Sequence, residues 1–177
     1  MTEPVNWPDD IFRVLKEAGI RQVAYVPDAG HTRLINLCRA DNAIRAIGLT
    51  TEEEGVALLA GAWLGGQRGV LLMQSSGIGN CINMLSLINQ CRFPLLSIVT
   101  MRGQWGEFNP WQVPMGQNGG ETLRLAGTLV YSVDEAARVG ETVEQAARLA
   151  FEGGISVAVL IGQRVIGSKT FGKTDHE

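Results

Sequence analysis

The chain has 177 residues, a net charge of −3, 45% hydrophobic residues and 19% charged residues. This composition is typical of a soluble globular protein with one sizeable core. The negative charge argues against nucleic acid or an anionic membrane surface as a partner, and no apolar run suggests a membrane span or a signal peptide. The three cysteines form no C-x-x-C pair, so we expect reduced thiols and a cytoplasmic location.

Short apolar runs alternate with helical patterns along the chain. The predicted strands are 22–26, 44–49, 69–73, 94–100, 128–131 and 155–161. The predicted helices are 8–18, 32–39, 53–64, 80–90, a short one at 121–126, and 134–151. This alternation predicts an α/β fold of three layers, αβα, with a central six-stranded and mainly parallel sheet. We expect one domain over residues 1–167 and a frayed tail over 168–177.

Four loops follow predicted strands, so they should lie together at the edge of the sheet where such proteins bind ligands. They are 27–31, 50–53, 74–80 and 101–115. The last belongs to a segment of prolines, glycines and aromatics, 101–120, in which no regular element is predicted. Loops of this length are usually functional or disordered, and the aromatic residues argue against disorder.

Three glutamates, Glu52, Glu53 and Glu54, occupy the first turn of a predicted helix, where the helix dipole favours them. The body of that helix, 56–64, is apolar and small, which suggests burial on most sides. A carboxyl group directed into such surroundings must be paired or protonated, and buried acids are common at active sites. On these residues alone, a solvated helix cap remains the better interpretation.

The segment 74–80, Gln-Ser-Ser-Gly-Ile-Gly-Asn, joins a buried strand to a helix. In that geometry backbone N–H groups can approach a ligand closely. The segment is neither a dinucleotide fingerprint nor a P-loop, so a stand-alone nucleotide-binding domain ranks last among the possible functions. By itself it fits a tight turn as well as a ligand cradle.

Taken together, these motifs resemble the pyrimidine-binding (PYR) domain of thiamine-diphosphate enzymes. The segment 73–80, Met-Gln-Ser-Ser-Gly-Ile-Gly-Asn, is similar to Met-Gln-Asn-Ser-Gly-Leu-Gly-Asn of the phosphonopyruvate and sulfopyruvate decarboxylases. The resemblance covers about residues 8–167. Placing Ala62 and Trp63 on the family's Gly-Tyr pair puts the family's glutamate on Glu53, with Glu52 and Glu54 as the neighbouring alternatives.

The resemblance implies thiamine diphosphate as the cofactor and a role for each matching residue. Glu53 would be the catalytic acid that contacts N1′ of the aminopyrimidine. The other expected cofactor contacts are Pro27, Ser76, Gly77, Ile78 and Asn80, and the expected substrate contacts are Asp28, His31, Arg102 and Gln112. A guanidinium such as that of Arg102 matches a carboxylate, phosphonate or sulfonate, although an exposed arginine explains it equally well. Trp105 and Trp111 either line the pocket or pack against a partner subunit.

In this family a second domain, the PP domain, holds the diphosphate and Mg²⁺ through a Gly-Asp-Gly…Asn motif. No aspartate in this sequence precedes a glycine, so we expect no metal ligands here and a beta subunit that carries the motif. The resemblance thus implies the alpha subunit of a two-subunit 2-oxo acid decarboxylase, a lyase, with active sites between subunits of a hetero-oligomer.

Two alternatives stay open: a carboligase subunit with the same cofactor, or an interaction subunit that has lost the chemistry. The identity of the 2-oxo acid is also open. Ser75 replaces the family's asparagine, and the tryptophan-rich segment 104–111 has no counterpart in the motif, so the substrate could differ from sulfopyruvate. The subunit stoichiometry cannot be read from the sequence.

Overall fold

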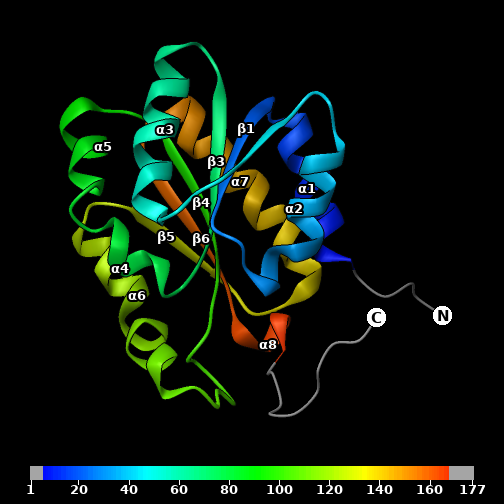
Figure 1. Cartoon of the computed structure of the whole chain (residues 1–177), viewed down its shortest axis with the longest axis vertical. Helices are drawn as coiled ribbons and strands as arrows, with labels where there is room; N and C mark the ends of the chain where they lie inside the picture. Colours follow the sequence, from blue (N-terminus) through cyan, green and yellow to red (C-terminus); the bar gives the residue numbers. More distant parts are fainter. Residues whose placement is uncertain (1–5, 168–177) are drawn as a thin grey trace.

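Six apolar runs form one sheet at the centre of the computed structural model, which describes residues 6–167 (Figure 1). The strands are β1 (Ile20–Tyr25), β2 (Arg45–Gly48), β3 (Arg68–Gln74), β4 (Leu95–Thr100), β5 (Leu129–Val133) and β6 (Ser156–Ile161). Their spatial order is β2-β1-β3-β4-β6-β5, and every pairing is parallel. The predicted six-stranded αβα architecture is confirmed. The expected tail, 168–177, lies outside the described residues.

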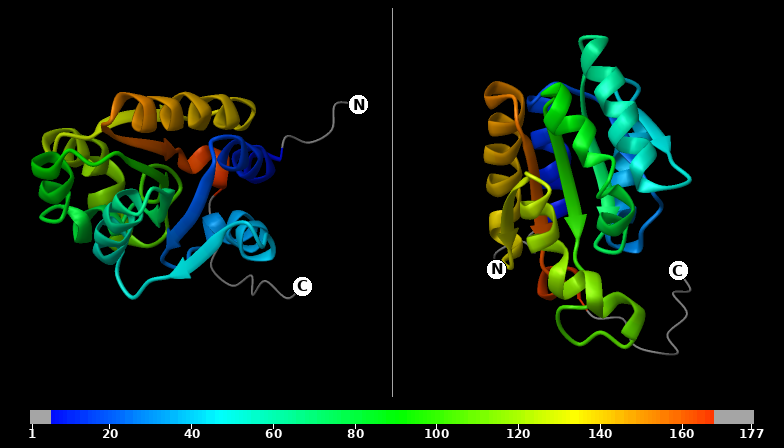
Figure 2. Two further views of the ribbon diagram at one scale, coloured as in Figure 1. Left: turned by 90° about the horizontal axis from the view of Figure 1, so that it is seen from above. Right: turned by 90° about the vertical axis from the view of Figure 1, so that its left-hand side faces the viewer.

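Helices cover both faces of this sheet, as the side view in Figure 2 shows. They are α1 (Trp7–Glu17), α2 (Thr32–Ala40), α3 (Glu52–Leu64), α4 (Gly77–Cys81), α5 (Leu85–Cys91), α6 (Val113–Leu125), α7 (Val139–Gly153) and α8 (Gln163–Ile166). Short 3-10 turns, η1 (Ala29–His31), η2 (Pro110–Gln112) and η3 (Ala136–Arg138), precede α2, α6 and α7. No helix among residues 6–167 is long and apolar enough to cross a membrane.

The alternation of side chains along each strand divides the interior into two cores. Val70 and Leu72 of β3 face one core, which α1, α2 and α7 cover. Leu71 and Met73 face the other, which α3, α4, α5 and α6 cover. Because both faces are covered, the central strands are apolar along their whole length, and all six residues of β4 are buried.

The strand order reverses direction between β1 and β3. The chain leaves β1 through α2 toward the edge strand β2, and it leaves β3 through α4 and α5 toward β4 on the other side. The elements after β1 and β3 therefore lie on opposite faces of the sheet. In open α/β sheets this switch point is the usual ligand-binding position.

Helix α6 differs from the sequence-based expectation, because it begins at Val113 rather than near residue 121. Glycines, which lower helix propensity, hid its first two turns. The packing requires two of them: a Cβ on Gly116 would collide with the backbone of Arg102 and Gly103, and one on Gly119 would lie 2.7 Å from Cδ1 of Ile78. The irregular segment after β4 is therefore confined to 101–112.

Candidate functional site

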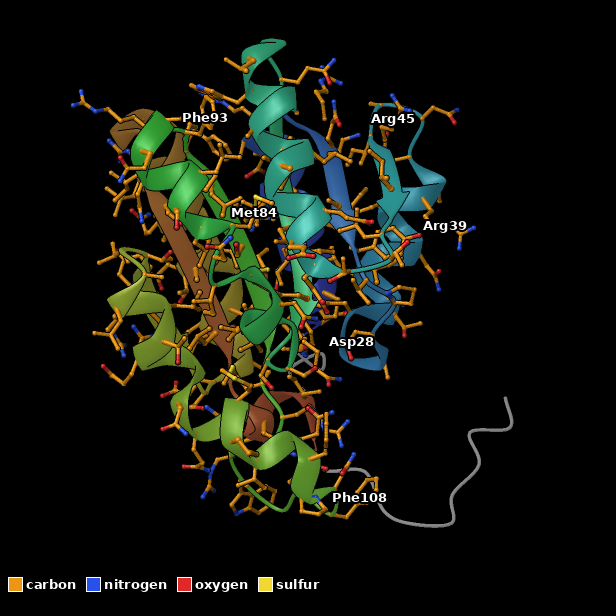
Figure 3. The ribbon with its side chains drawn as sticks, turned by 60° about the vertical axis from the view of Figure 1, so that its left-hand side comes forward. Asp28, Arg39, Arg45, Met84, Phe93 and Phe108 are labelled. Atoms are coloured by element: carbon orange, nitrogen blue, oxygen red, sulfur yellow. The ribbon has the colours of Figure 1, made fainter. Side chains whose placement is uncertain are left out.

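The carboxyl ends of three neighbouring strands are tied together by one aspartate. Asp28, in the loop after β1, accepts a hydrogen bond from Nε2 of Gln74 at the end of β3 (2.9 Å). Its second oxygen accepts from the hydroxyl of Thr100, the last residue of β4. Figure 3 shows Asp28 at this end of the sheet. The expected convergence of the loops after the strands is thus realised at the switch point.

Glu52, and not Glu53, is the glutamate that enters the interior of the protein. Its residue is 7% exposed, whereas Glu53 and Glu54 are exposed. Positions 52, 56 and 59 lie on one face of α3, toward the sheet, so Glu52 shares the buried face of Val56 and Leu59. The motif register predicts Glu53 as the family's glutamate with Glu52 as a neighbouring alternative, and the burial of the side chains favours this alternative. Glu54 instead accepts a hydrogen bond from the backbone N–H of Thr50 (2.9 Å), as a helix-start residue does.

The carboxylate of Glu52 lies against the turn between β3 and α4. Its Oε2 accepts a hydrogen bond from Nδ2 of Asn80 (2.7 Å). A Cβ on Gly77 would lie 2.5 Å from the Glu52 carboxyl carbon, so only glycine allows this approach. Burial, together with the charges of Glu52 and Glu53, raises the pKa of the neighbouring thiol of Cys81 to about 12. That thiol stays protonated beside the carboxylate.

The remaining expected cofactor contacts take different positions around this carboxylate. The hydroxyl of Ser76 donates to Oε1 of Gln74 (3.2 Å), which links the turn to Asp28. The side chain of Ile78 is fully buried in the core, so this residue offers only its backbone to a ligand. Pro27 is exposed in the loop after β1.

His31 lies inside the protein and not on its surface. Its ring is fully buried, and Nε2 is 3.1 Å from the carbonyl oxygen of Ile98, to which it donates in one tautomer. Nδ1 has no hydrogen-bond partner among the described residues. Burial lowers the pKa of His31 below its usual range, so the ring is neutral. Through its contact with Ile98, the ring holds the loop after β1 against β4.

Arg102 is held by an acid of its own chain. Its Nε and Nη2 each lie 2.5 Å from the carboxylate of Glu107, and the two side chains are only 14% and 3% exposed. The pairing lowers the pKa of Glu107 to about 2, mainly through the hydrogen bonds from Arg102. Gln163 adds a bond from Nε2 to the same carboxylate (3.0 Å). This guanidinium therefore orders segment 101–112 and does not stand free for an anionic substrate.

Gln112 and the two tryptophans of this segment lie farther out. Oε1 of Gln112 is buried without a hydrogen-bond partner among the described residues. Trp105 is 50% exposed and Trp111 is 81% exposed. Figure 3 shows the neighbouring Phe108 at the same end of the molecule as Asp28. The structure thus brings Glu52, Gly77 and Asn80 together and leaves the tryptophans pointing outward.

The comparisons with known proteins agree with this geometry. Residues 6–111 match the family model "Thiamine pyrophosphate enzyme, N-terminal TPP binding domain". The sulfopyruvate decarboxylase subunit alpha of Methanothermobacter thermautotrophicus is 34% identical over 89% of this chain and 96% of its own length. The chain belongs to the thiamine pyrophosphate enzyme family.

Two further matches extend this assignment. The phosphonopyruvate decarboxylase of Streptomyces viridochromogenes is 42% identical over 66% of this chain and 30% of its own length. The 2-oxoglutarate:ferredoxin oxidoreductase of Magnetococcus marinus superposes with a TM-score of 0.69 over 90% of this chain and 29% of that one. At 13% identity the second match concerns the fold alone.

The chain, a thiamine pyrophosphate enzyme domain, has a carboxyl group packed on a glycine turn at the switch point of its sheet. The absence of a Cβ at Gly77 lets the Glu52 carboxyl lie directly against the turn. No hydrogen bond to Oε1 of Glu52 occurs within residues 6–167, so this oxygen fits a ring nitrogen of an aminopyrimidine. No cluster of three or more His, Cys, Asp or Glu side chains suited to a metal ion occurs in that part of the chain.

Several residues that fix this end of the fold were not predicted from the sequence. Gln74 and Thr100 orient Asp28, and Glu107 and Gln163 hold the segment after β4. Position at the end of a buried strand was a usable signal for Gln74 and Thr100. Nothing local marked Gln163, because its partners lie more than fifty positions earlier in the chain.

Proposed function

We propose that this chain is the pyrimidine-binding alpha subunit of a thiamine-diphosphate-dependent 2-oxo acid decarboxylase. The observation that carries the proposal is the buried carboxylate of Glu52, placed against Gly77 and Asn80 at the switch point of the sheet. The near full-length match to a protein named sulfopyruvate decarboxylase subunit alpha supports the reaction class.

When bound, thiamine diphosphate supplies an electron-accepting ring that makes the loss of carbon dioxide from a 2-oxo acid feasible. In this proposal Glu52 exchanges a proton with N1′ of the aminopyrimidine, the role that the sequence analysis gave to Glu53. Asn80 fixes the orientation of the Glu52 carboxylate through its hydrogen bond, and Gly77 lets this carboxylate pack directly against the turn.

Asp28 is the substrate-facing residue that we propose on this chain. Its carboxylate lies at the carboxyl ends of β1, β3 and β4, oriented by Gln74 and Thr100, and so keeps a fixed position relative to the turn after β3. We propose that Arg102 stabilises the segment after β4, because its guanidinium group is already paired with Glu107. Gln112 remains a proposed contact, since its buried Oε1 has no partner among the described residues.

We further propose a beta subunit that carries the PP domain, the Gly-Asp-Gly…Asn motif and Mg²⁺, in a hetero-oligomer that acts in the cytoplasm. The relatives named "subunit alpha" support a partner of this kind. The exposed Trp105 and Trp111 are the side chains that we expect to meet it, because large aromatics are enriched at subunit interfaces.

The test compares Glu52→Gln with Glu53→Gln in the complex purified with its native partner subunit. Replacing a general acid–base group typically costs roughly 10²–10⁴-fold in rate, so we expect Glu52→Gln to lose that much carbon dioxide release from sulfopyruvate. Glu53→Gln should stay within about twofold of wild type, since its side chain is solvated. Full activity in Glu52→Gln would contradict the assignment. A product containing a new carbon–carbon bond in place of released carbon dioxide would favour the carboligase alternative.

A further inference from the structure

Ser75 is the residue at which the motif 73–80 departs from the similar motif of the phosphonopyruvate and sulfopyruvate decarboxylases. It directly follows β3, and it is completely buried. Its backbone N–H donates to the carbonyl oxygen of Thr100 (2.9 Å), which extends the ladder between β3 and β4 by one residue beyond the pair of Gln74 and Thr100. From this point the side chain of Ser75 joins the two chain segments.

The hydroxyl of Ser75 binds both backbone groups of Arg102. Its Oγ accepts a hydrogen bond from the backbone N–H of Arg102 (3.0 Å) and donates one to the carbonyl oxygen of the same residue (3.2 Å). One side chain thus acts as a neighbouring strand would. Backbone N–H and C=O groups away from water need partners, so this hydroxyl fixes segment 101–112 where it leaves the sheet.

Helix α6 packs on the other side of the same peptide. A Cβ on Gly116 would lie 2.0 Å from the carbonyl oxygen of Arg102, so only glycine allows this contact. A Cβ on Gly103 would lie 2.2 Å from the carbonyl oxygen of Gln112, just before α6. Nε2 of Gln117 donates to the carbonyl oxygen of Gly103 (2.8 Å). The position of the Arg102 backbone therefore determines where the first turns of α6 lie.

These first turns of α6 cover the turn on which Glu52 packs. A Cβ on Gly119 would lie 2.7 Å from Cδ1 of Ile78. A Cβ on Gly79 would lie 3.5 Å from Sδ of Met115. Figure 1 shows α4, which begins in this turn, beside α6. A continuous series of contacts therefore leads from the hydroxyl of Ser75 through segment 101–112 and α6 to the turn beside Glu52.

We propose that Ser75 is a positioning residue of the candidate site. Its hydroxyl fixes the backbone of Arg102, this backbone positions the start of α6, and α6 holds the turn 77–80 beside Glu52. The inference rests on the proposed function, because it concerns the binding of thiamine diphosphate at this turn. Loss of the hydroxyl weakens the hold on the cofactor and leaves the carboxyl group of Glu52 in place.

The first experiment compares amide hydrogen exchange in the full chain carrying Ser75→Ala or the matched control Ser97→Ala, without cofactor. Ser97 is a buried serine in the middle of β4. We expect the amides of 101–105 and 113–119 to exchange roughly tenfold faster in Ser75→Ala, because local opening breaks fewer hydrogen bonds. The amides of 95–100 should keep their wild-type rates, which shows an intact fold. Ser97→Ala should match the wild type throughout.

The second experiment measures cofactor use in the complex purified with its native partner subunit. We expect Ser75→Ala to raise the KM for thiamine diphosphate about tenfold, with a smaller fall in kcat, because Glu52 keeps its hydrogen bond to Asn80. Ser97→Ala should keep both constants. A general structural defect would instead lower the fraction of assembled complex and leave the KM unchanged.

Three outcomes would overturn the proposal: unchanged exchange at 101–105 and 113–119 in Ser75→Ala, an unchanged KM for thiamine diphosphate, or equal effects of the two serine substitutions. Faster exchange over the whole sheet in Ser75→Ala would also overturn it, because the hydroxyl would then act on overall stability. The exchange data need neither cofactor nor activity. Failure of this proposal can therefore be told apart from failure of the proposed function, which Glu52→Gln tests.

Discussion

At the scale of single residues, the contact between Gly77 and Glu52 is the tightest constraint in the candidate site. A methyl group at position 77 would meet Cγ and Cδ of Glu52 at 2.6 and 2.5 Å. We expect Gly77→Ala to lower the free energy of unfolding by about 1–3 kcal/mol, the usual cost of overpacking. Gly79→Ala is the control in the same helix, because its methyl group would meet only Sδ of Met115 at 3.5 Å. Urea denaturation of both variants checks this, and equal stability would contradict it.

The choice between Glu52 and Glu53 also has a residue-scale cause. Helix α3 is apolar and small on almost all sides, so its sequence contains no polar face that indicates which of three consecutive glutamates points inward. Tertiary packing determines the inward face, since Cδ1 of Leu71 and Cδ1 of Leu49 would lie 2.5 and 2.9 Å from a Cβ on Gly55, on the face next to Glu52. A motif register based on one aromatic residue could not replace that information.

At the scale of elements, segment 101–112 depends on the carboxylate of Glu107. This carboxylate accepts from Arg102 and Gln163 side chains and from the backbone N–H of Asn109 (3.0 Å). We expect Glu107→Gln to lower the free energy of unfolding by about 3 kcal/mol, because it leaves a mostly buried guanidinium without its counter-charge. Glu152→Gln removes an exposed i,i+4 partner of Arg148 and should cost less than about 0.5 kcal/mol. Similar unfolding midpoints for the two variants would exclude the supporting role.

The same carboxylate makes the stability depend on pH. The pKa of Glu107 is about 2 in the folded chain against an ordinary value of 4.5, so the unfolded chain binds the proton first. Its stabilisation is fully present above about pH 4.5 and is lost as the pH falls toward 2, amounting to at most about 3 kcal/mol. Chemical denaturation of wild type and Glu107→Gln between these pH values should give converging stabilities. Parallel curves would show that another group is responsible.

At the scale of the whole molecule, the parallel sheet should open from its edge. β4 is buried at every residue and paired on both sides, whereas β2 is an edge strand with no fully buried residue. We expect amide hydrogens of β3, β4 and β6 to exchange only on global unfolding. Those of β2 should exchange roughly 100-fold faster or more, through local opening. Native-state hydrogen exchange with mass spectrometry measures both, and uniform protection across the sheet would contradict this expectation.

The sequence by itself determined the layered architecture and the edge of the sheet that carries the site. Continuous apolar runs such as 94–100 are typical of strands in a parallel sheet that is covered on both faces. This pattern can be recognised from the sequence alone. The motif 73–80 was also readable, because a strand, a glycine turn and a helix start are contiguous in the chain.

Only the tertiary structure decided which side chains meet. Glu52 reaches Asn80 across 28 positions and Asp28 reaches Thr100 across 72. Gln163, the first residue of α8, accepts a hydrogen bond from the backbone N–H of Gln104 in segment 101–112. The early start of α6 likewise depends on glycines that only close packing explains. Residue spacing predicts neighbours within one element, but contacts between loops are set by strand order and by the face on which each helix returns.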